Sequence, residues 1–508
     1  MTRGHVFVVR GRLEEIGWDV AVVPTDASFT VERHWWALWG GGDPAGVRPP
    51  DWGRQGAAPA VGRDDVWFLD VVEGDVPDVG RSLGRLLRAI DSAKPEPRNR
   101  RVRPLIAMPV LGSAGGGFNH VRGQLLEEIL DVTDHAVDHL GIDVAIVALN
   151  ASAFAALQAM RRTRGFRGLD DERLAVARQL GGVARAGELA LFLGAGVSMS
   201  AGLPSWGELI RRLAPDDTPL DDLGLLDQAE LLRRRWESRE GRLGEEVVDV
   251  MDAGEPPALA HALLAGLDTR EIITTNFDDL FERAVRSVSG DDDAIAVLPW
   301  MRPRADRPWI LKMHGDVRRP QSIVLSRRDF VRYDAMWRPV GSVVQTLMLS
   351  RHLLVVGASL TDDNLLRLAH EVIDFRRMNQ LDTPIGTVLT LGIKAAQAEL
   401  WEGELDHVSV SDVVVPPRGA DGRDAASDQT VRDLAIFLDA LGMYASSDVS
   451  YLLDARYAAM LGGEDAREAA ALARELHRAA DALDDGGADD PWGALARALR
   501  AFGADVAQ

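Results

Sequence analysis

The chain has 508 residues, enough for about two to four domains, and its hydrophobic fraction of 46% and charged fraction of 27% are ordinary for a globular protein. It contains no cysteine, which excludes a disulfide framework, a thiolate nucleophile and any cysteine-based zinc or iron–sulfur site. The formal net charge of −21 argues against general nucleic-acid binding, because an acidic surface repels the phosphate backbone.

The hydropathy pattern bears on location. Residues 1–12 lack the apolar core of a signal peptide, and no stretch of about 18 apolar residues runs uninterrupted. We therefore expect neither export nor membrane spanning, and a cytoplasmic location.

The first part of the chain, residues 1–165, has the pattern of an α/β domain. A glycine-rich run at 112–117 and a helical pattern at 124–140 separate two apolar runs, which predicts a crossover unit with a parallel sheet. The basic run 94–103 is either a solvated loop or a contact for a phosphate or a partner. Strands are predicted at 5–9, 19–24, 65–71, 104–111 and 143–149.

A second α/β domain is predicted over residues 166–415, opening with a helix at 170–186 and carrying a helical insertion at about 205–269. A loop at 415–430 leads to a helical C-terminal region, 430–508, that closes with a short helix at 492–502. The predicted fold class is α/β: a Rossmann-like parallel sheet with a helical insertion, preceded by an α/β domain. Strands of the second domain are predicted at 189–193, 271–275, 309–313, 352–356 and 385–391.

The segment 190–206, ALFLGAGVSMSAGLPSW, is the most informative in the chain. An apolar strand ends in Gly194-Ala195-Gly196, and a helix is expected to start near Ser198. Glycines permit a sharp turn and a close approach to a pyrophosphate, and a helix N-terminus attracts the anion. The segment predicts the turn of a dinucleotide-binding crossover, although such a turn alone is a weak signal.

Asn276 and Asp278 follow the next predicted strand of this domain, in the segment TTNFDDL. Loops at the carboxyl ends of parallel strands border the ligand site of such sheets. An asparagine there can hydrogen-bond ribose hydroxyls or hold a water molecule. The alternative is that both side chains only cap the next helix.

His314, in the sequence HGD, also comes directly after a predicted strand. Histidine can accept a proton near neutral pH, and the following glycine leaves room for a substrate. Of the eleven histidines, this is the one that stands after a strand and beside a glycine. A purely structural role remains the alternative.

A fourth strand end carries Gly357-Ala358-Ser359, followed by a predicted helix. Ser359 could reach a phosphate or a ribose. The alternative is a simple turn in which Thr361 or Asp362 caps the helix. Each of the four motifs has such an alternative, but all four occur in order at strand ends and suit a dinucleotide.

This ordered set resembles the sirtuin family, over roughly residues 185–395. The resemblance implies that NAD is the substrate and that its bond between nicotinamide and ribose is cleaved. It places Asn276 and Asp278 by the nicotinamide ribose, with Asn276 holding a water or hydroxyl, and it makes His314 the general base. It assigns the pyrophosphate and the adenosine side to Gly194, Ala195, Gly196, Ser198, Gly357 and Ser359.

Two departures from protein-deacylating sirtuins narrow this resemblance. Those enzymes carry a zinc module of four cysteines, which this chain lacks. Where they read Gly-Ile-Pro-Asp-Phe-Arg, this chain reads GLPSWG at 202–207. The chain is therefore similar to the zinc-free bacterial sirtuin-like proteins, many of which hydrolyse NAD in anti-phage defence, and no metal is expected.

The N-terminal segments DVAVVPTD (19–26) and IAMPVLGSAGGGF (106–118) resemble a diverged macro domain, a fold that binds ADP-ribose. The resemblance implies that Asp26 faces the adenine region and that the loop 112–118 wraps a phosphate. The Asn-Ala-Ala-Asn segment of that fold is missing, so a scaffold or oligomerisation role stays open.

The sequence thus predicts an NAD+ glycohydrolase that releases nicotinamide and ADP-ribose or a cyclised form. We expect this activity to be held off until a trigger arrives, because constant cleavage of NAD would kill the host. The alternative is a non-catalytic sensor or assembly subunit that binds NAD or ADP-ribose; a deacylase is disfavoured. The resemblance also implies a homo-oligomer and an activating partner, such as an ATPase, a nuclease-like protein or a phage protein.

Overall fold

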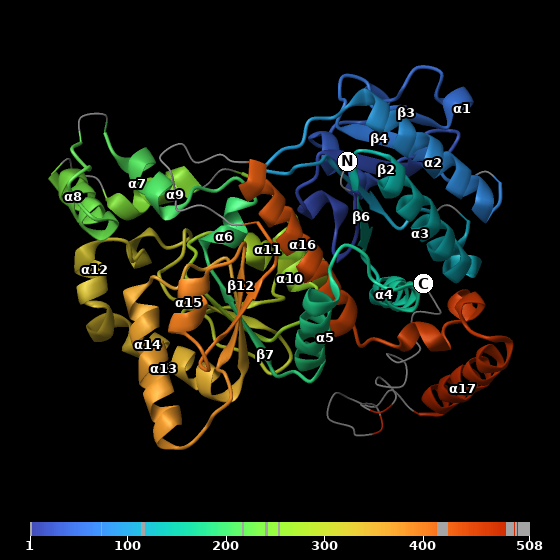
Figure 1. Ribbon diagram of the computed structural model, residues 1–508. Helices are drawn as coiled ribbons and strands as arrows, with labels where there is room; N and C mark the ends of the chain where they lie inside the picture. The colour runs from blue at the N-terminus through green and yellow to red at the C-terminus, as the bar shows by residue number, and fades with distance from the viewer. Residues whose placement is uncertain are drawn as a thin grey trace.

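The computed structural model describes residues 3–72, 74–112, 117–215, 218–238, 242–251, 254–413 and 425–483, with the single residues 492 and 495. Two β-sheets form the frame of this described part, and each is flanked by helices (Figure 1). The predicted C-terminal helix at 492–502 and most of the glycine-rich run at 112–117 lie outside the described residues.

The N-terminal sheet has the strand order β1-β6-β5-β2-β4-β3. Its pairs are parallel except for β3, which runs antiparallel to β4 at the edge. The five predicted strands are confirmed, and the three-residue edge strand β3 is an addition. The strands are β1 (Val6–Arg10), β2 (Val20–Thr25), β3 (Ala57–Pro59), β4 (Val66–Asp70), β5 (Leu105–Pro109) and β6 (Asp143–Ala148).

Successive side chains of β1 point to opposite faces of this sheet and join different cores. Val6 and Val8 join the core formed with the helices that cover the outer face, whereas Phe7 and Val9 join a second core on the inner face. Both faces are therefore buried, as expected for a mainly parallel sheet. The helices of this part are α1 (Trp52–Gln55), α2 (Val76–Ala93), α3 (Arg122–His139) and α4 (Ala151–Arg164).

The second sheet has the order β13-β12-β11-β7-β8-β10-β9, and all of its pairs are parallel. Because β7 lies between β8 and β11, the chain order reverses at β7. Such a switch point leaves a crevice outside the carboxyl ends of the strands, where ligands of these folds bind. The strands are β7 (Leu189–Leu193), β8 (Glu271–Thr274), β9 (Ala296–Leu298), β10 (Trp309–Lys312), β11 (His352–Val356), β12 (Gly386–Thr390) and β13 (Asp406–Ser409).

Helices separate most of these strands, and the predicted helical insertion is present as α7 to α10. Its first three helices share a small core of their own, while α10 lies against the sheet. The helices are α5 (Asp171–Arg185), α6 (Ala195–Met199), α7 (Trp206–Leu213), α8 (Leu225–Ser238), α9 (Leu243–Met251), α10 (Leu259–Ala265), α11 (Leu280–Ser289), α12 (Arg327–Val331), α13 (Tyr333–Ser350), α14 (Asp363–Met378), α15 (Ala395–Leu400), α16 (Ala425–Ala445) and α17 (Gly463–Ala482).

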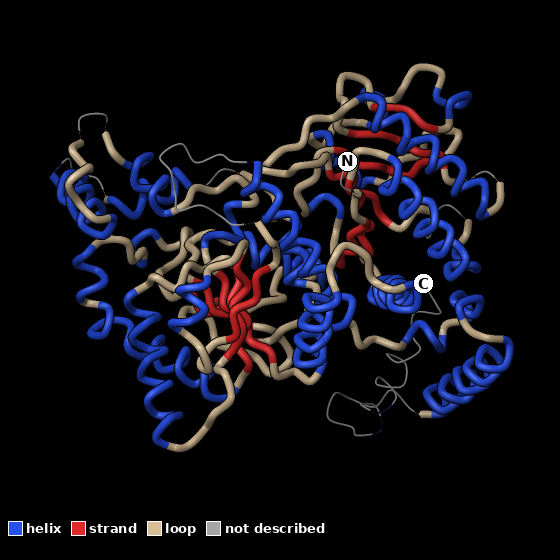
Figure 2. The backbone as a smooth tube through the Cα atoms, viewed as in Figure 1, coloured by secondary structure: helices blue, strands red, loops and turns tan. Residues whose placement is uncertain are grey.

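One continuous core joins the two sheets. Helices α5, α10 and α16 lie between them, and Figure 2 shows the two groups of strands separated by these helices. Residues of α16, such as Phe437 and Leu441, share a cluster with Phe7 of the first sheet and Leu191 of the second. The two halves are thus packed on a common helical layer.

Helix α16 differs from the expected loop at 415–430, because it already begins at Ala425. The helix is held by a buried ionic network: Asp439 accepts from Arg161 Nη1 at 3.0 Å, and its other oxygen lies 2.8 Å from His5 Nε2. Asp428, in the first turn, pairs with Arg100 of the basic run at 2.9 Å. These contacts with the N-terminal part favour helix over loop at 425–430.

The basic run 94–103 is largely an internal contact. Arg101 donates to the buried carboxylate of Asp19 at 2.9 Å and to the backbone oxygen of Gly17 at 2.6 Å. Neither expectation describes Arg100 and Arg101, because both are engaged within the chain; a contact of the run with a phosphate or a partner stays untested.

Candidate functional site

Three glycines bring the turns after β7 and β11 together at the switch point. Gly357 has a φ of +71°, and a Cβ there would lie 2.6 Å from the backbone nitrogen of Val197. A Cβ on Gly194 or Gly196 would come within 2.6 and 2.8 Å, respectively, of backbone atoms of Gly357 or Ala358. These positions require glycine because two backbones pass in direct contact.

Two glycine amides of this turn already donate hydrogen bonds within the structure. Gly194 N donates to Val356 O at 2.9 Å, and Gly196 N donates to Gly357 O at 2.9 Å. The two glycines therefore hold the turns against each other. Their predicted contact with a pyrophosphate, shared with Ala195 and Ser198, stays a prediction.

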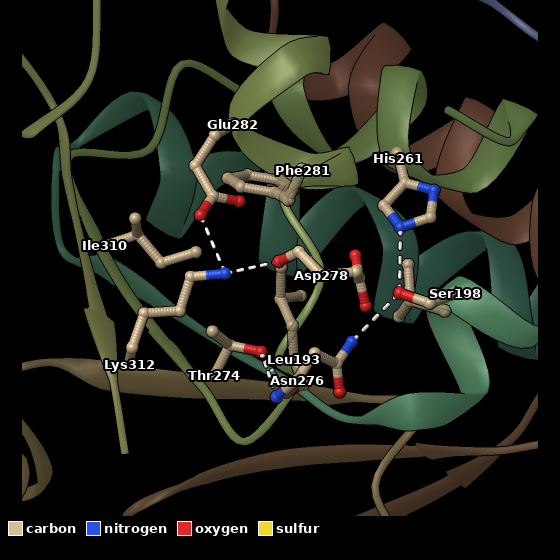
Figure 3. A pocket seen from close by; sticks show the side chains of 11 residues that line it. Leu193, Ser198, His261, Thr274, Asn276, Asp278, Phe281, Glu282, Ile310 and Lys312 are labelled. Carbon is tan, nitrogen blue, oxygen red and sulfur yellow. Dashed lines mark hydrogen bonds and ion pairs between the residues drawn. The ribbon is translucent and has the colours of Figure 1, made fainter. Parts of the chain in front are cut away.

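Asn276 lies at the centre of the site. Its Nδ2 donates to the backbone oxygen of Gly194 at 3.1 Å. It also donates to Ser198 Oγ at 3.0 Å, as Figure 3 shows. Thr274 Oγ1 accepts from Asn276 N at 3.0 Å and donates to Leu193 O at 2.9 Å, which fixes the loop on the end of β7. The side chain bridges β8 and β7 and does not cap α11.

This bonding fixes the direction of the carboxamide. A carbonyl oxygen such as that of Gly194 can only accept, so the amide nitrogen must face it. Asn276 Oδ1 is left buried without a hydrogen-bond partner in the described structure. The Asn276 side chain is among those that line a cavity of about 10 Å³, room for about one water molecule, and Figure 3 shows its Nδ2 facing Ser198 and its Oδ1 turned away from Ser198. An unpaired buried acceptor such as Oδ1 is suited to hold a water or a hydroxyl.

Asp278 lines the same cavity. Its Oδ1 accepts from Leu280 N at 3.1 Å, so the residue does stabilise the start of α11, as the alternative held. Its Oδ2, however, is buried and unpartnered, and Figure 3 shows the carboxylate directed into the cavity. A buried oxygen without a partner can accept a hydrogen bond from a ligand hydroxyl.

A buried ion pair contacts the loop that carries Asp278. Lys312 Nζ lies 2.7 Å from Glu282 Oε1, and it also donates to the backbone oxygen of Asp278. Both side chains are almost fully buried. Burial would lower the pKa of Lys312, but the negative charges of Glu282, Asp316 and Asp278 outweigh it and raise that pKa, so the ammonium stays charged.

His314 lies at the same edge of the sheet as Asn276. Lys312 and Thr274 are in register on neighbouring strands, and Met313 N donates to Thr274 O at 2.9 Å. Asn276 lies two positions after Thr274, and His314 lies two positions after Lys312. A second backbone bond, from Val317 N to Phe277 O at 2.9 Å, keeps the two loops together beyond the strands.

The imidazole of His314 is buried, at 2% exposure, and packs against Phe330 and Tyr333. Its Nε2 lies 3.2 Å from Asp362 Oδ2, but without the geometry of a hydrogen bond. Burial lowers the pKa of His314, and the negative charge of Asp362 opposes this shift only in part. A neutral imidazole near pH 7 is the form that can accept a proton.

The turn after β11 lies at the same switch point, against the turn after β7. Ser359 is exposed, and its Oγ lies 2.7 Å from Thr361 Oγ1. Asp362 caps α14 through Leu365 N at 2.9 Å, as the alternative for this turn held. Asp362 thus has two contacts, the cap and the approach to His314.

Sequence reasoning missed four side chains of this site: His261, Glu282, Lys312 and Asp362 in its role beside His314. Lys312 had a signal, because a lysine inside the apolar strand WILKM is costly unless it is paired. His261 had none, since it stands in a helical insertion without a motif.

Further features bear on the other predictions. Asp26 accepts from Thr30 N at 2.8 Å, which ties its carboxylate into its own loop.

Within the described ranges, no group of three or more His, Asp or Glu side chains is arranged to hold a metal ion. In that same part of the chain, no helix is both long and apolar enough to cross a membrane.

Comparison with known proteins agrees with this geometry. A model of the SIR2-like domain matches residues 270–402, which include Asn276, His314 and Gly357. The NAD(+) hydrolase ThsA of Bacillus cereus (strain MSX-D12) is 30% identical over 182 residues, 35% of this chain and 38% of that protein. ThsA of Enterococcus faecium is 30% identical over 206 residues, 38% and 42% of the two chains.

Defense-associated sirtuin 2 of Bacillus subtilis is 23% identical over 204 residues, 39% of this chain and 20% of that protein. The matches thus span less than half the length of these relatives. The strand order with its switch point, the glycine turns and the matched model together show that this chain contains a SIR2-like domain.

Proposed function

We propose that this chain is an NAD+ hydrolase that releases nicotinamide and acts in bacterial defence against phage. The observation that carries the proposal is the buried, unpartnered Oδ1 of Asn276, held in one orientation at the switch point of a SIR2-like domain. The names of the relatives, NAD(+) hydrolase and defense-associated sirtuin, support the same activity and setting.

The proposed reaction is the attack of a water oxygen on the anomeric carbon of the nicotinamide ribose. The bond to nicotinamide breaks, the pyridine nitrogen keeps its electron pair, and ADP-ribose results; a cyclised form would require a nucleophile of the same molecule to attack that carbon in place of water. Asn276 Oδ1 would orient the ribose or the water, and His314 would take the proton. Fixed orientation suits an oxocarbenium-like transition state, because the protein is ordered before the reaction begins.

Restraint of this activity is supported by the size of the cavity at Asn276. A volume of about 10 Å³ admits about one water molecule but no nicotinamide ring. We propose that the turns after β8, β10 and β11 separate before the substrate enters, on a signal from an activating protein or from assembly of several copies.

A non-catalytic sensor of NAD or ADP-ribose is the second candidate, and it too requires this site to open before NAD binds. We further propose a cytoplasmic location, a metal-free site and the domain division at 165 and 415. Ligand binding by the N-terminal domain near Asp26 is likewise a proposal.

The deciding experiment incubates the purified full chain with NAD+, alone and with candidate activators, and measures free nicotinamide. Hydrolysis predicts release that Asn276→Ala and His314→Ala abolish while the variants remain folded. Calorimetric binding of NAD+ without release under any condition would instead support the sensor.

A further inference from the structure

Helix α10 places a buried histidine against the serine that holds Asn276. His261 is 1% exposed, and its Nε2 lies 3.3 Å from Ser198 Oγ (Figure 3). His261 lines the same cavity as Asn276 and Asp278, yet it stands 15 residues before Asn276 in a segment without a recognised motif.

The hydrogen bonds of His261 determine its tautomer. The backbone nitrogen of Ala258 donates to Nδ1 at 3.1 Å, so Nδ1 carries no proton. In the neutral ring the proton is then on Nε2, which donates to Ser198 Oγ. Burial lowers the pKa of His261 to about 4, so this neutral form persists through the physiological range.

Ser198 Oγ consequently accepts two hydrogen bonds, one from His261 and one from Asn276 Nδ2. Two acceptor positions are all that a hydroxyl offers, so its own proton points elsewhere. Neither contact can reverse, because Gly194 O holds the amide nitrogen and Ala258 N holds the imidazole. The direction of the whole chain of contacts is fixed.

We propose that His261 is a positioning residue that fixes the carboxamide of Asn276 through the hydroxyl of Ser198. The inference rests on the proposed hydrolysis of NAD+, since its effect is on the orientation of Asn276 Oδ1. His261 itself touches neither the substrate nor the reacting atoms. Catalytic side chains need such supporting hydrogen bonds to hold their geometry.

The packing of α10 makes it a firm support for this relay. The helix contacts α6, α11 and α16, and also β1 of the first sheet. Just before it, Pro257 O accepts from Gly17 N at 2.8 Å. The relay to Asn276 therefore starts on an element that both sheets hold in place.

Four substitutions in the full chain test the relay under conditions in which the wild type releases nicotinamide. His261→Leu and Ser198→Ala should each lower kcat at least tenfold, and His261→Leu should change KM for NAD+ less than threefold. His261→Gln keeps a donor for Ser198 and should stay within about fivefold of the wild type. His261→Asn keeps the acceptor for Ala258 N but cannot reach Ser198, and should resemble His261→Leu.

His352→Leu is the matched control. It removes a histidine whose Nε2 lies 2.9 Å from Thr387 Oγ1 in the same sheet, but at the amino end of β11. Its kcat should stay near the wild-type value. Thermal unfolding measures whether each variant is folded. If His261→Leu does not fold, the comparison of His261→Gln with His261→Asn decides the test.

Equal kcat values for His261→Asn and His261→Gln, or wild-type kcat for His261→Leu, would overturn the relay. The double variant His261→Leu/Ser198→Ala should be no slower than the slower single variant; a multiplied loss would also overturn it. Absence of nicotinamide release from the wild type in every condition would contradict the proposed function and not the relay alone.

Discussion

The carboxamide of Asn276 donates to the backbone oxygen of Gly194 at 3.1 Å, across 82 positions of sequence. This bond joins the turn after β7 to the loop after β8. The orientation of Asn276 therefore depends on the turn after β7, which the glycines hold against the turn after β11. The site is consequently a property of the contact between loops, and a change in any one of them should reach Asn276.

The first prediction concerns that orientation. Asn276→Asp keeps an oxygen where Oδ1 stands but places a second one against Gly194 O, where only a donor fits. We expect nicotinamide release to fall by roughly 100-fold or more, as when an enzyme loses one oriented polar group. The control is Asn379→Asp, which alters an amide that donates to Phe375 O on the surface. Its activity should remain unchanged; equal losses in both variants would contradict the assignment.

The second prediction separates backbone strain from loop contact. Gly187 and Gly357 both have a φ of +71°, but only Gly357 would bring a Cβ within 2.6 Å of a backbone atom, since Gly187 faces open space. Gly187→Ala should cost about 1 kcal/mol of unfolding free energy, from the left-handed backbone.

Gly357→Ala should cost about 1–3 kcal/mol more, because two packed turns must move apart. It should also weaken NAD+ binding, whereas Gly187→Ala should not. Urea unfolding and calorimetry measure the two effects. Equal costs at the two positions would mean that the close approach of the turns is unimportant.

The long buried strands could be predicted from sequence because their apolar runs end at clear turn residues. The strands 189–193 and 352–356, for example, lie where the sequence placed them. Three edge strands were missed: β3, β9 and β13. Each has three or four residues, and β13 reads DHVS, so neither length nor hydropathy distinguishes it from a loop.

The site was predictable only as far as its residues follow strands. Asn276 and His314 stand at strand ends, and the parallel register brings them to one edge. His261 reaches the site from a helical insertion, a tertiary contact that no local pattern encodes. The helix at 425–430 was missed for a similar reason, because its partners, including Arg100, lie in the N-terminal part.

The third prediction concerns the buried pair Lys312–Glu282. Lys312→Met leaves the Glu282 carboxylate buried without its partner, which should cost about 3–5 kcal/mol of unfolding free energy. Because Lys312 also holds Asp278 O, nicotinamide release should fall as well. The double variant Lys312→Met/Glu282→Leu should recover part of the stability.

An exposed pair provides the comparison for this experiment. Arg304 contacts Asp306 at 3.2 Å on the surface, and Arg304→Met should leave the urea midpoint unchanged. A double variant no more stable than Lys312→Met alone would argue against an unpaired charge as the cause of the loss.

The fourth prediction concerns the pH dependence of activity. The lowered pKa of His314 keeps the imidazole neutral below the ordinary histidine value of about 6.5. The decrease of kcat/KM toward acid pH should therefore have its midpoint below about pH 6.5. Asp362→Asn removes the charge that opposes the shift but keeps a capping side chain, so it should move the midpoint to still lower pH. A midpoint above about 6.5, or a shift upward, would exclude His314 as the base.

The last prediction concerns stability and His261. Its pKa is about 4 in the folded chain and about 6.5 when unfolded, so between these values the unfolded state binds more protons. Stability from this residue is thus complete above about pH 6.5 and is lost as the pH falls toward 4. Between pH 7 and 5 the wild type should lose about 2 kcal/mol more unfolding free energy than His261→Gln. From pH 7 to 8 the two urea-unfolding curves should run parallel, because the ring is then neutral in both states. Parallel behaviour down to pH 5 would mean that the imidazole is not buried as a neutral donor, and the support that it gives to Ser198 would have to be abandoned.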